Sequence, residues 1–102
     1  MRIPTHRPPT HPGEMLREEF LPDTGLTQQQ LADRLGISFR RVNEILNEKR
    51  PVTTDTALRL ARLFDMEVQF WLNAQLAYDL FVALHGPLAE QVRREVQPLH
   101  AA

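Results

Sequence analysis

The chain has 102 residues, a length that fits one domain with one core, and its 42% hydrophobic and 25% charged residues are ordinary for a globular protein. The formal net charge of -1 excludes a protein that coats nucleic acid through overall positive charge, so any affinity for DNA must come from a local patch. The lack of cysteine excludes disulfides and cysteine-based zinc sites, and no run approaches the roughly 20 apolar residues of a membrane span, so we expect a cytoplasmic protein.

Proline marks the ends of the predicted domain. Four of the eight prolines lie in residues 1–12, and proline has no amide donor and restricts its predecessor, so residues 1–11 are predicted to form an extended, partly mobile arm. Residues 98–102 are expected to fray. Between them, residues 12–97 show helical spacing and no period-two strand, which predicts an all-α domain.

The first two helices have clear boundaries. Pro12 suits the first turn of a helix, which we expect to end at Pro22 and Gly25. Thr27 and Gln30 have the spacing of a capping box and predict the start of a second helix.

The next boundary is at Gly36, where we expect the positive φ that ends a helix. Ser38 is the predicted cap of a third helix, whose Val42, Ile45 and Leu46 face inward. A fourth helix is expected to begin at Thr54 or Asp55, a fifth to span residues 68–84, and a sixth to span residues 88–96 after the break at Gly86-Pro87.

The segment from Thr27 to Asn47 predicts a helix-turn-helix, in which two short helices meet at Gly36. Ala32 is small where the helices approach closely, and Ile37 fills the turn. Such a pair can present its second helix to the major groove of DNA while its first helix crosses the backbone.

A helical projection at about 100° per residue separates the inward face of the third helix from its outward face. Arginine can bond guanine bidentately and asparagine adenine, and Phe39 could contact a thymine methyl, with packing at the edge of the core as its alternative. The predicted base-reading residues are Ser38, Phe39, Arg40, Arg41 and Asn43. The predicted phosphate contacts are Gln28, Asn47, Lys49 and Arg50. The alternative is a solvated surface on which these charges pair with Asp33, Glu44 and Glu48.

The fifth helix has more apolar side chains than one core-facing stripe needs. A second stripe left uncovered usually marks an interface, so we predict a homodimer surface that includes Trp71, Leu72, Tyr78 and Val82, together with the sixth helix. The alternative is that this helix is central and buried within the monomer. In a dimer, two recognition helices about 34 Å apart would read a palindrome.

Nothing in the chain predicts an enzyme, a metal site or a cofactor. His6, His11, His85 and His100 are scattered, without the spacing of a zinc site on one helix. There is no glycine-rich phosphate loop, nucleophile elbow or acid–base pair, and Asp55 and Asp65 are interpreted as cap or loop residues.

Four blocks of sequence resemble the HigA antitoxins, a branch of the Cro/lambda-repressor-like (XRE) helix-turn-helix superfamily. The resemblance covers about residues 11–84, and its last block is the most specific because generic phage repressors lack it. Glu48 stands where many members have glycine. The blocks are His11-Pro12-Gly13-Glu14, then Val42-Asn43-Glu44-Ile45-Leu46-Asn47 followed by Lys49-Arg50, then Thr54-x-Thr56-Ala57-x-Arg59-Leu60-Ala61, then Phe70-Trp71-Leu72-Asn73-x-Gln75-x-x-Tyr78-Asp79-Leu80.

The resemblance implies a lambda-repressor-like domain of five or six helices and a homodimeric antitoxin. Such proteins bind a HigB-type toxin, a small basic ribosome-dependent mRNA endonuclease, and repress their own operon by binding a palindromic operator. By the family pattern, Arg40 and Arg41 would read DNA. One alternative is a stand-alone repressor without a toxin partner. A second is an interaction module that has lost DNA binding, against which the retained Arg40, Asn43, Lys49 and Arg50 argue.

Overall fold

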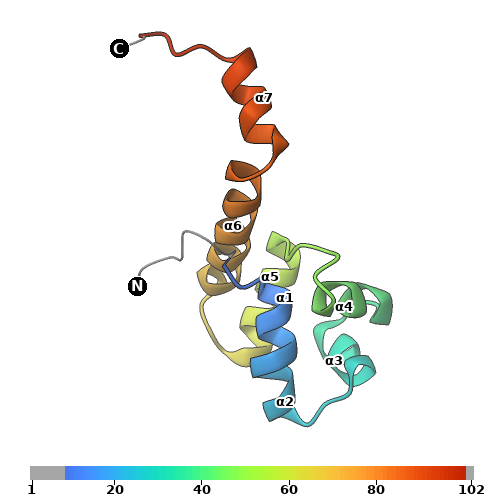
Figure 1. The fold of residues 1–102 in the computed structure, drawn as a ribbon. Coiled ribbons are helices and arrows are strands. Elements are labelled where there is room, and N and C mark those ends of the chain that lie inside the picture. The colour runs from blue at the N-terminus through green and yellow to red at the C-terminus, as the bar shows by residue number, and fades with distance from the viewer. Residues whose placement is uncertain (1–8, 101–102) are drawn as a thin grey trace.

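The computed structural model describes residues 9–100, and all regular structure in that range is helical. Helices α1 to α5 and the first half of α6 form a bundle, while the second half of α6 and α7 extend away from it (Figure 1). The all-α prediction is therefore confirmed. In chain order the elements are α1 (Pro12–Met15), the π-helical η1 (Leu16–Phe20), α2 (Leu21–Thr24), α3 (Gln28–Leu35), α4 (Phe39–Leu46), α5 (Thr54–Phe64), α6 (Val68–Leu84) and α7 (Pro87–Glu95).

The first helical run continues through Pro22, so the prediction that this proline helps to end it was wrong. A proline ring crowds the carbonyl four residues earlier and removes one amide donor. In η1 the backbone instead follows the wider π pattern, with Leu21 N–H donating to Leu16 O. This wider turn directly before Pro22 leaves room for the ring, and the run ends at Gly25, which has a φ of 70°.

His11 belongs to the folded domain, which corrects the last residue of the predicted arm. Its side chain is buried, and its Nδ1 accepts a hydrogen bond from Gly13 N at 2.9 Å, which caps α1. Its ring meets Tyr78 of α6 edge to face at 4.8 Å between centroids. Burial lowers the pKa of His11, against the opposing effect of Glu48, Asp79 and Glu14. The rest of the predicted arm, up to residue 8, and residues 101–102 of the predicted tail lie outside the described residues.

The helix-turn-helix is capped as the sequence predicts. Thr27 Oγ1 accepts from Gln30 N at 3.1 Å, and Gln30 Oε1 accepts from Thr27 N at 2.9 Å. Gly36 ends α3 with a φ of 72°, and Ser38 Oγ accepts from Arg41 N at 3.1 Å at the start of α4. These contacts fix the angle at which α4 leaves α3.

The fourth and sixth predicted helices also form, with small changes at their ends. Thr53 caps α5, which begins at Thr54, and Asp65 in a left-handed conformation ends it. Gly86 precedes α7, which spans Pro87–Glu95, one residue earlier than predicted at each end. None of the helices in the described range is both long and apolar enough to cross a membrane.

The core lies between η1, α3, α4, α5 and the first half of α6. Trp71 is fully buried at its centre, with the rings of Phe20, Phe70 and Phe64 at 5.0, 5.2 and 6.4 Å. Because this cluster is internal to one chain, Trp71 is not available to a dimer surface, which corrects that prediction. The buried hydrophobic members are Leu16, Leu31, Ala32, Leu35, Val42, Ile45, Leu46, Val52, Ala57, Leu60 and Trp71.

Candidate nucleic-acid interface

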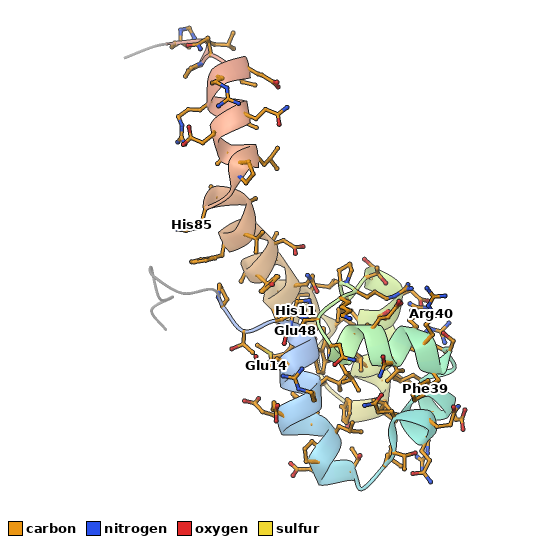
Figure 2. All side chains as sticks on the ribbon, turned by 45° about the vertical axis from the view of Figure 1, so that its right-hand side comes forward. His11, Glu14, Phe39, Arg40, Glu48 and His85 are labelled. Carbon is orange, nitrogen blue, oxygen red and sulfur yellow. The ribbon has the colours of Figure 1, made fainter. Side chains whose placement is uncertain are left out.

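Helix α4 packs one face on the core and leaves the other in solvent. Val42, Ile45 and Leu46 are buried, as predicted. On the opposite face the Arg40 side chain is 84% exposed, and Phe39, on a flank at the start of α4, is 44% exposed. Figure 2 shows both on the outer side of the bundle, well separated from His11. This face is therefore accessible to a groove of DNA.

Arg40 is restrained by a neighbour on its own helix. Its Nε donates to Glu44 Oε2 at 3.4 Å, across one helical turn. Glu44 Oε1 in turn accepts from Arg50 Nη2 at 2.7 Å and from Arg50 Nε at 3.0 Å. The hydrogen bonds from Arg50, and then that from Arg40, hold the pKa of the Glu44 carboxyl below its usual range. Arg50, predicted as a phosphate contact, is thus paired with a carboxylate in the free chain.

Arg41 is turned toward α5 rather than toward solvent. Its Nη2 donates to Asp55 Oδ2 at 2.7 Å and to Thr56 Oγ1 at 2.6 Å. Arg59 Nε also donates to Asp55, so hydrogen bonds from Arg41 and then Arg59 keep the pKa of Asp55 below its usual range. Asp55 is therefore an ion-pair partner within the first turn of α5 and not a cap.

Two amides link α4 to α3 and to the following loop. Asn43 Nδ2 donates to Gln28 Oε1 at 3.1 Å, which joins a predicted base-reading residue to a predicted phosphate contact. Asn47 Nδ2 donates to Asn43 O at 2.9 Å and remains exposed at the end of α4. Asn43 is therefore ordered by the contact between the two helices, and Asn47 by the last turn of α4, before any ligand binds.

The loop after α4 is a Schellman turn with an unusual residue in its left-handed position. Glu48 N donates to Ile45 O at 3.0 Å, Lys49 N donates to Glu44 O at 2.8 Å, and Glu48 has a φ of 61°. Glycine is the usual residue at this position. Lys49 is exposed and forms no ion pair with any residue in the range 9–100, so its charge is available to a phosphate.

Comparison with known proteins decides the family. The helix-turn-helix family model matches residues 16–71, more than half of the chain. Virulence-associated protein I of Dichelobacter nodosus is 51% identical over 86 residues, which are 81% of this chain and 80% of that protein. The structure of Pseudomonas aeruginosa antitoxin HigA with the higBA promoter is 41% identical with a TM-score of 0.80, over 90% of this chain and 99% of that one. The structure of antitoxin GraA in complex with its operator is 40% identical with a TM-score of 0.82, over 99% and 100%.

The chain belongs to the HigA antitoxins of the helix-turn-helix family. This membership confirms the predicted family and the lambda-repressor-like fold, and it makes the chain a non-enzymatic DNA-binding regulator. Within the described range no group of His, Asp and Glu is placed to hold a metal ion.

Two arginines that were not predicted as site residues support the two helices of the helix-turn-helix in this HigA-family protein. Arg17 Nη1 donates to Leu46 O at 2.6 Å and so closes the last turn of α4. Arg59 Nη1 donates to Leu35 O at 2.9 Å and closes the last turn of α3. Arg59 falls within a block shared with the family, and this could have indicated its role from the sequence. Nothing near Arg17 in the sequence indicates its role, because its partner Leu46 is far along the chain.

The remaining predicted dimer residues of this HigA-family protein differ in exposure. Leu72 is half-buried against the core, and Tyr78 is half-buried beside His11. Val82 is exposed and borders a small hollow with Gly86 and Leu88 at the junction of α6 and α7. Of the four predicted residues, Val82 therefore lies most openly on the surface.

Proposed function

We propose that this protein is the antitoxin of a HigBA-type system, which represses its own operon through α4 and neutralises a HigB-type toxin mRNA endonuclease by binding it. The observation that carries the DNA-binding half is the solvent-exposed Arg40 on a helix whose other face is fixed in the core. Solved relatives with promoter or operator DNA support it. Such a regulator acts on DNA in the cytoplasm.

In this proposal α4 enters the major groove. Arg40 contacts a base edge, Phe39 a thymine methyl, and Lys49 a flanking phosphate. Asn43 is held toward the groove by Gln28, and Asn47 and Arg50 lie beside it for backbone contacts. Ser38 caps α4 at the point of entry.

A gel shift with the DNA upstream of this protein's own gene tests operator binding. Arg40→Ala should cost roughly 1–3 kcal/mol at one base position and relax specificity there. Unchanged binding by an Arg40→Ala, Arg41→Ala double variant would refute the assignment of α4 as the recognition helix.

We propose a second copy of this chain as the partner of the stalk, defined as residues 76–96 of α6, α7 and the residue after them. Its exposed apolar side chains are Leu76, Leu80, Val82, Leu84, Leu88, Val92 and Val96. A groove of about 640 Å³ runs between Leu80, Leu84, Leu88 and Val92. The chain measures 55 × 28 × 21 Å because the stalk projects from the bundle (Figure 1).

Exposure of this apolar surface to water is energetically unfavourable, and the surface is covered when two stalks pack together. The dimer would place two α4 helices on a palindromic operator, where the second contact becomes intramolecular. The stalk thus links the shape of the chain to the symmetry of its DNA site.

The oligomeric state tests this pairing. Sedimentation at micromolar concentration should give a dimer for the wild type and a monomer for Leu84→Asp. Leu58→Asp is the matched control, because Leu58 is a similarly exposed leucine on α5, outside the stalk. A monomeric wild type would refute the proposed dimer. Equal dissociation by both variants would show that the stalk is not its specific interface.

Toxin binding separates the antitoxin from a stand-alone repressor. Co-expression with the neighbouring small open reading frame should give a stable complex and rescue growth, and the same complex can be added to the gel shift. Absence of both complex and rescue would leave a repressor without a toxin partner.

A further inference from the structure

Three charged side chains on the DNA face form a connected series. Arg50 donates two hydrogen bonds to one oxygen of Glu44, and Glu44 contacts Arg40 through its other oxygen. Exposure is lowest at the middle of the series, because the Glu44 side chain is 28% exposed, that of Arg50 44% and that of Arg40 84%. Glu44 is therefore the sheltered, fixed member, and Arg40 is the member that reaches outward.

The atom that Glu44 contacts leaves the recognition edge of Arg40 open. Only Nε of Arg40 is engaged, and neither terminal nitrogen has a hydrogen-bond partner within residues 9–100. One N–H from each terminal nitrogen can together form a fork that bonds guanine O6 and N7. A contact at Nε restricts the rotation of the guanidinium plane without occupying the fork.

Such a restraint affects base and phosphate contacts unequally. A bidentate contact to a base requires one orientation of the guanidinium, whereas a phosphate accepts hydrogen bonds over a wide range. Binding to a base must immobilise a long arginine side chain, and the lost entropy opposes binding. A side chain that is already restrained loses less entropy, which favours the base contact over the phosphate contact.

We propose that Glu44 is a positioning residue that sets the base specificity of Arg40, and that Arg50 acts by fixing Glu44. This inference rests on the proposed operator binding. It assigns Glu44, which carries the wrong charge for a phosphate contact, a role on the DNA face. It also gives Arg50 a function in addition to the phosphate contact expected from its charge.

The ratio of two affinities tests this role. Fluorescence anisotropy at one salt concentration would compare a duplex from upstream of the protein's own gene with a scrambled duplex of equal length. Glu44→Ala should lower the ratio about tenfold. Loss of one negative charge strengthens binding to both duplexes and cancels in the ratio. Glu44→Gln keeps an acceptor for Arg40 Nε and should have a smaller effect.

Coupling to Arg40 distinguishes positioning from a general structural effect. In an Arg40→Ala background, Glu44→Ala should leave the ratio unchanged. Glu67→Ala is the charge-matched control, because Glu67 is an exposed carboxylate that lies outside both α4 and the stalk. It should leave the ratio at its wild-type value. If Glu44→Ala fails to fold in a thermal melt, Glu44→Leu, which also removes the acceptor for Arg40 Nε, carries the test with the same expected fall in the ratio.

Two results would overturn the inference: an unchanged ratio in Glu44→Ala, which would mean that Glu44 only repels DNA, or an equal drop with and without Arg40. A different result identifies failure of the proposed function itself. If Arg40→Ala alone leaves the ratio unchanged, α4 is not reading bases through Arg40, and this inference is lost with it.

Discussion

Replacing Gly13 with alanine should destabilise the domain because Gly13 packs directly on the backbone of the recognition helix. A Cβ at this position would lie 1.8 Å from Ile45 O and 3.0 Å from His11 Nδ1. Carbon–oxygen contacts of this kind are normally at least about 3.3 Å, so the overlap is about 1.5 Å. Neither backbone can yield easily, because Gly13 is in α1 and Ile45 is in α4. The cost belongs at the upper end of overpacking, about 3 kcal/mol.

Urea unfolding followed by tryptophan fluorescence measures this cost. Trp71 is the single tryptophan and is fully buried, so its emission reports loss of the core. All variants must be compared at one protein concentration, since dimerisation would contribute to stability. A loss of about 3 kcal/mol corresponds to a fall in Tm on the order of 15 °C for a domain of this size.

Gly25→Ala is the control for glycine replacement as such. Gly25 has a φ of 70° and nothing within 4 Å of its would-be Cβ. Alanine there should cost only the left-handed conformation, about 1 kcal/mol. If Gly13→Ala were no more destabilising than Gly25→Ala, the close approach of α1 to α4 would not be a source of stability, and the reasoning would fail.

Two further predictions concern the same region. Glu48→Gly should raise the free energy of unfolding by about 1 kcal/mol, because glycine removes the cost of the left-handed φ of 61°; a lower urea midpoint would contradict this. The lowered pKa of His11 means that the folded state binds its proton less readily than the unfolded state does. The stability from neutral His11 is therefore complete above pH 6.5 and is lost as the pH falls through the folded-state pKa. Urea midpoints at pH 7.5 and 5.5 should differ more in the wild type than in His11→Asn, which keeps a capping acceptor but does not titrate. An equal pH dependence would show that other groups cause it.

The sequence predicted the helix ends well where the cause is local. The capping box joins Thr27 to Gln30, and Ser38 and Gly36 act within one turn of their own positions. It failed at Pro22, because the π segment that accommodates the proline depends on how the whole first run packs. Burial of His11 was likewise hidden, since its neighbour Tyr78 lies far along the chain.

Helix α4 shows why a helical projection predicts which way a side chain points but not which contacts it makes. Arg40 and Arg41 are adjacent, and both have the chemistry of a base-reading residue. What separates them is α5, which places Asp55 and Thr56 beside Arg41 and nothing comparable beside the terminal nitrogens of Arg40 in the described range. Arg41 must break both hydrogen bonds before it can use Nη2 on a base, whereas Arg40, held only at Nε, can use either terminal nitrogen without breaking one. The packing of α5, which the sequence of α4 alone does not reveal, therefore decides which of the two arginines has a terminal nitrogen already engaged.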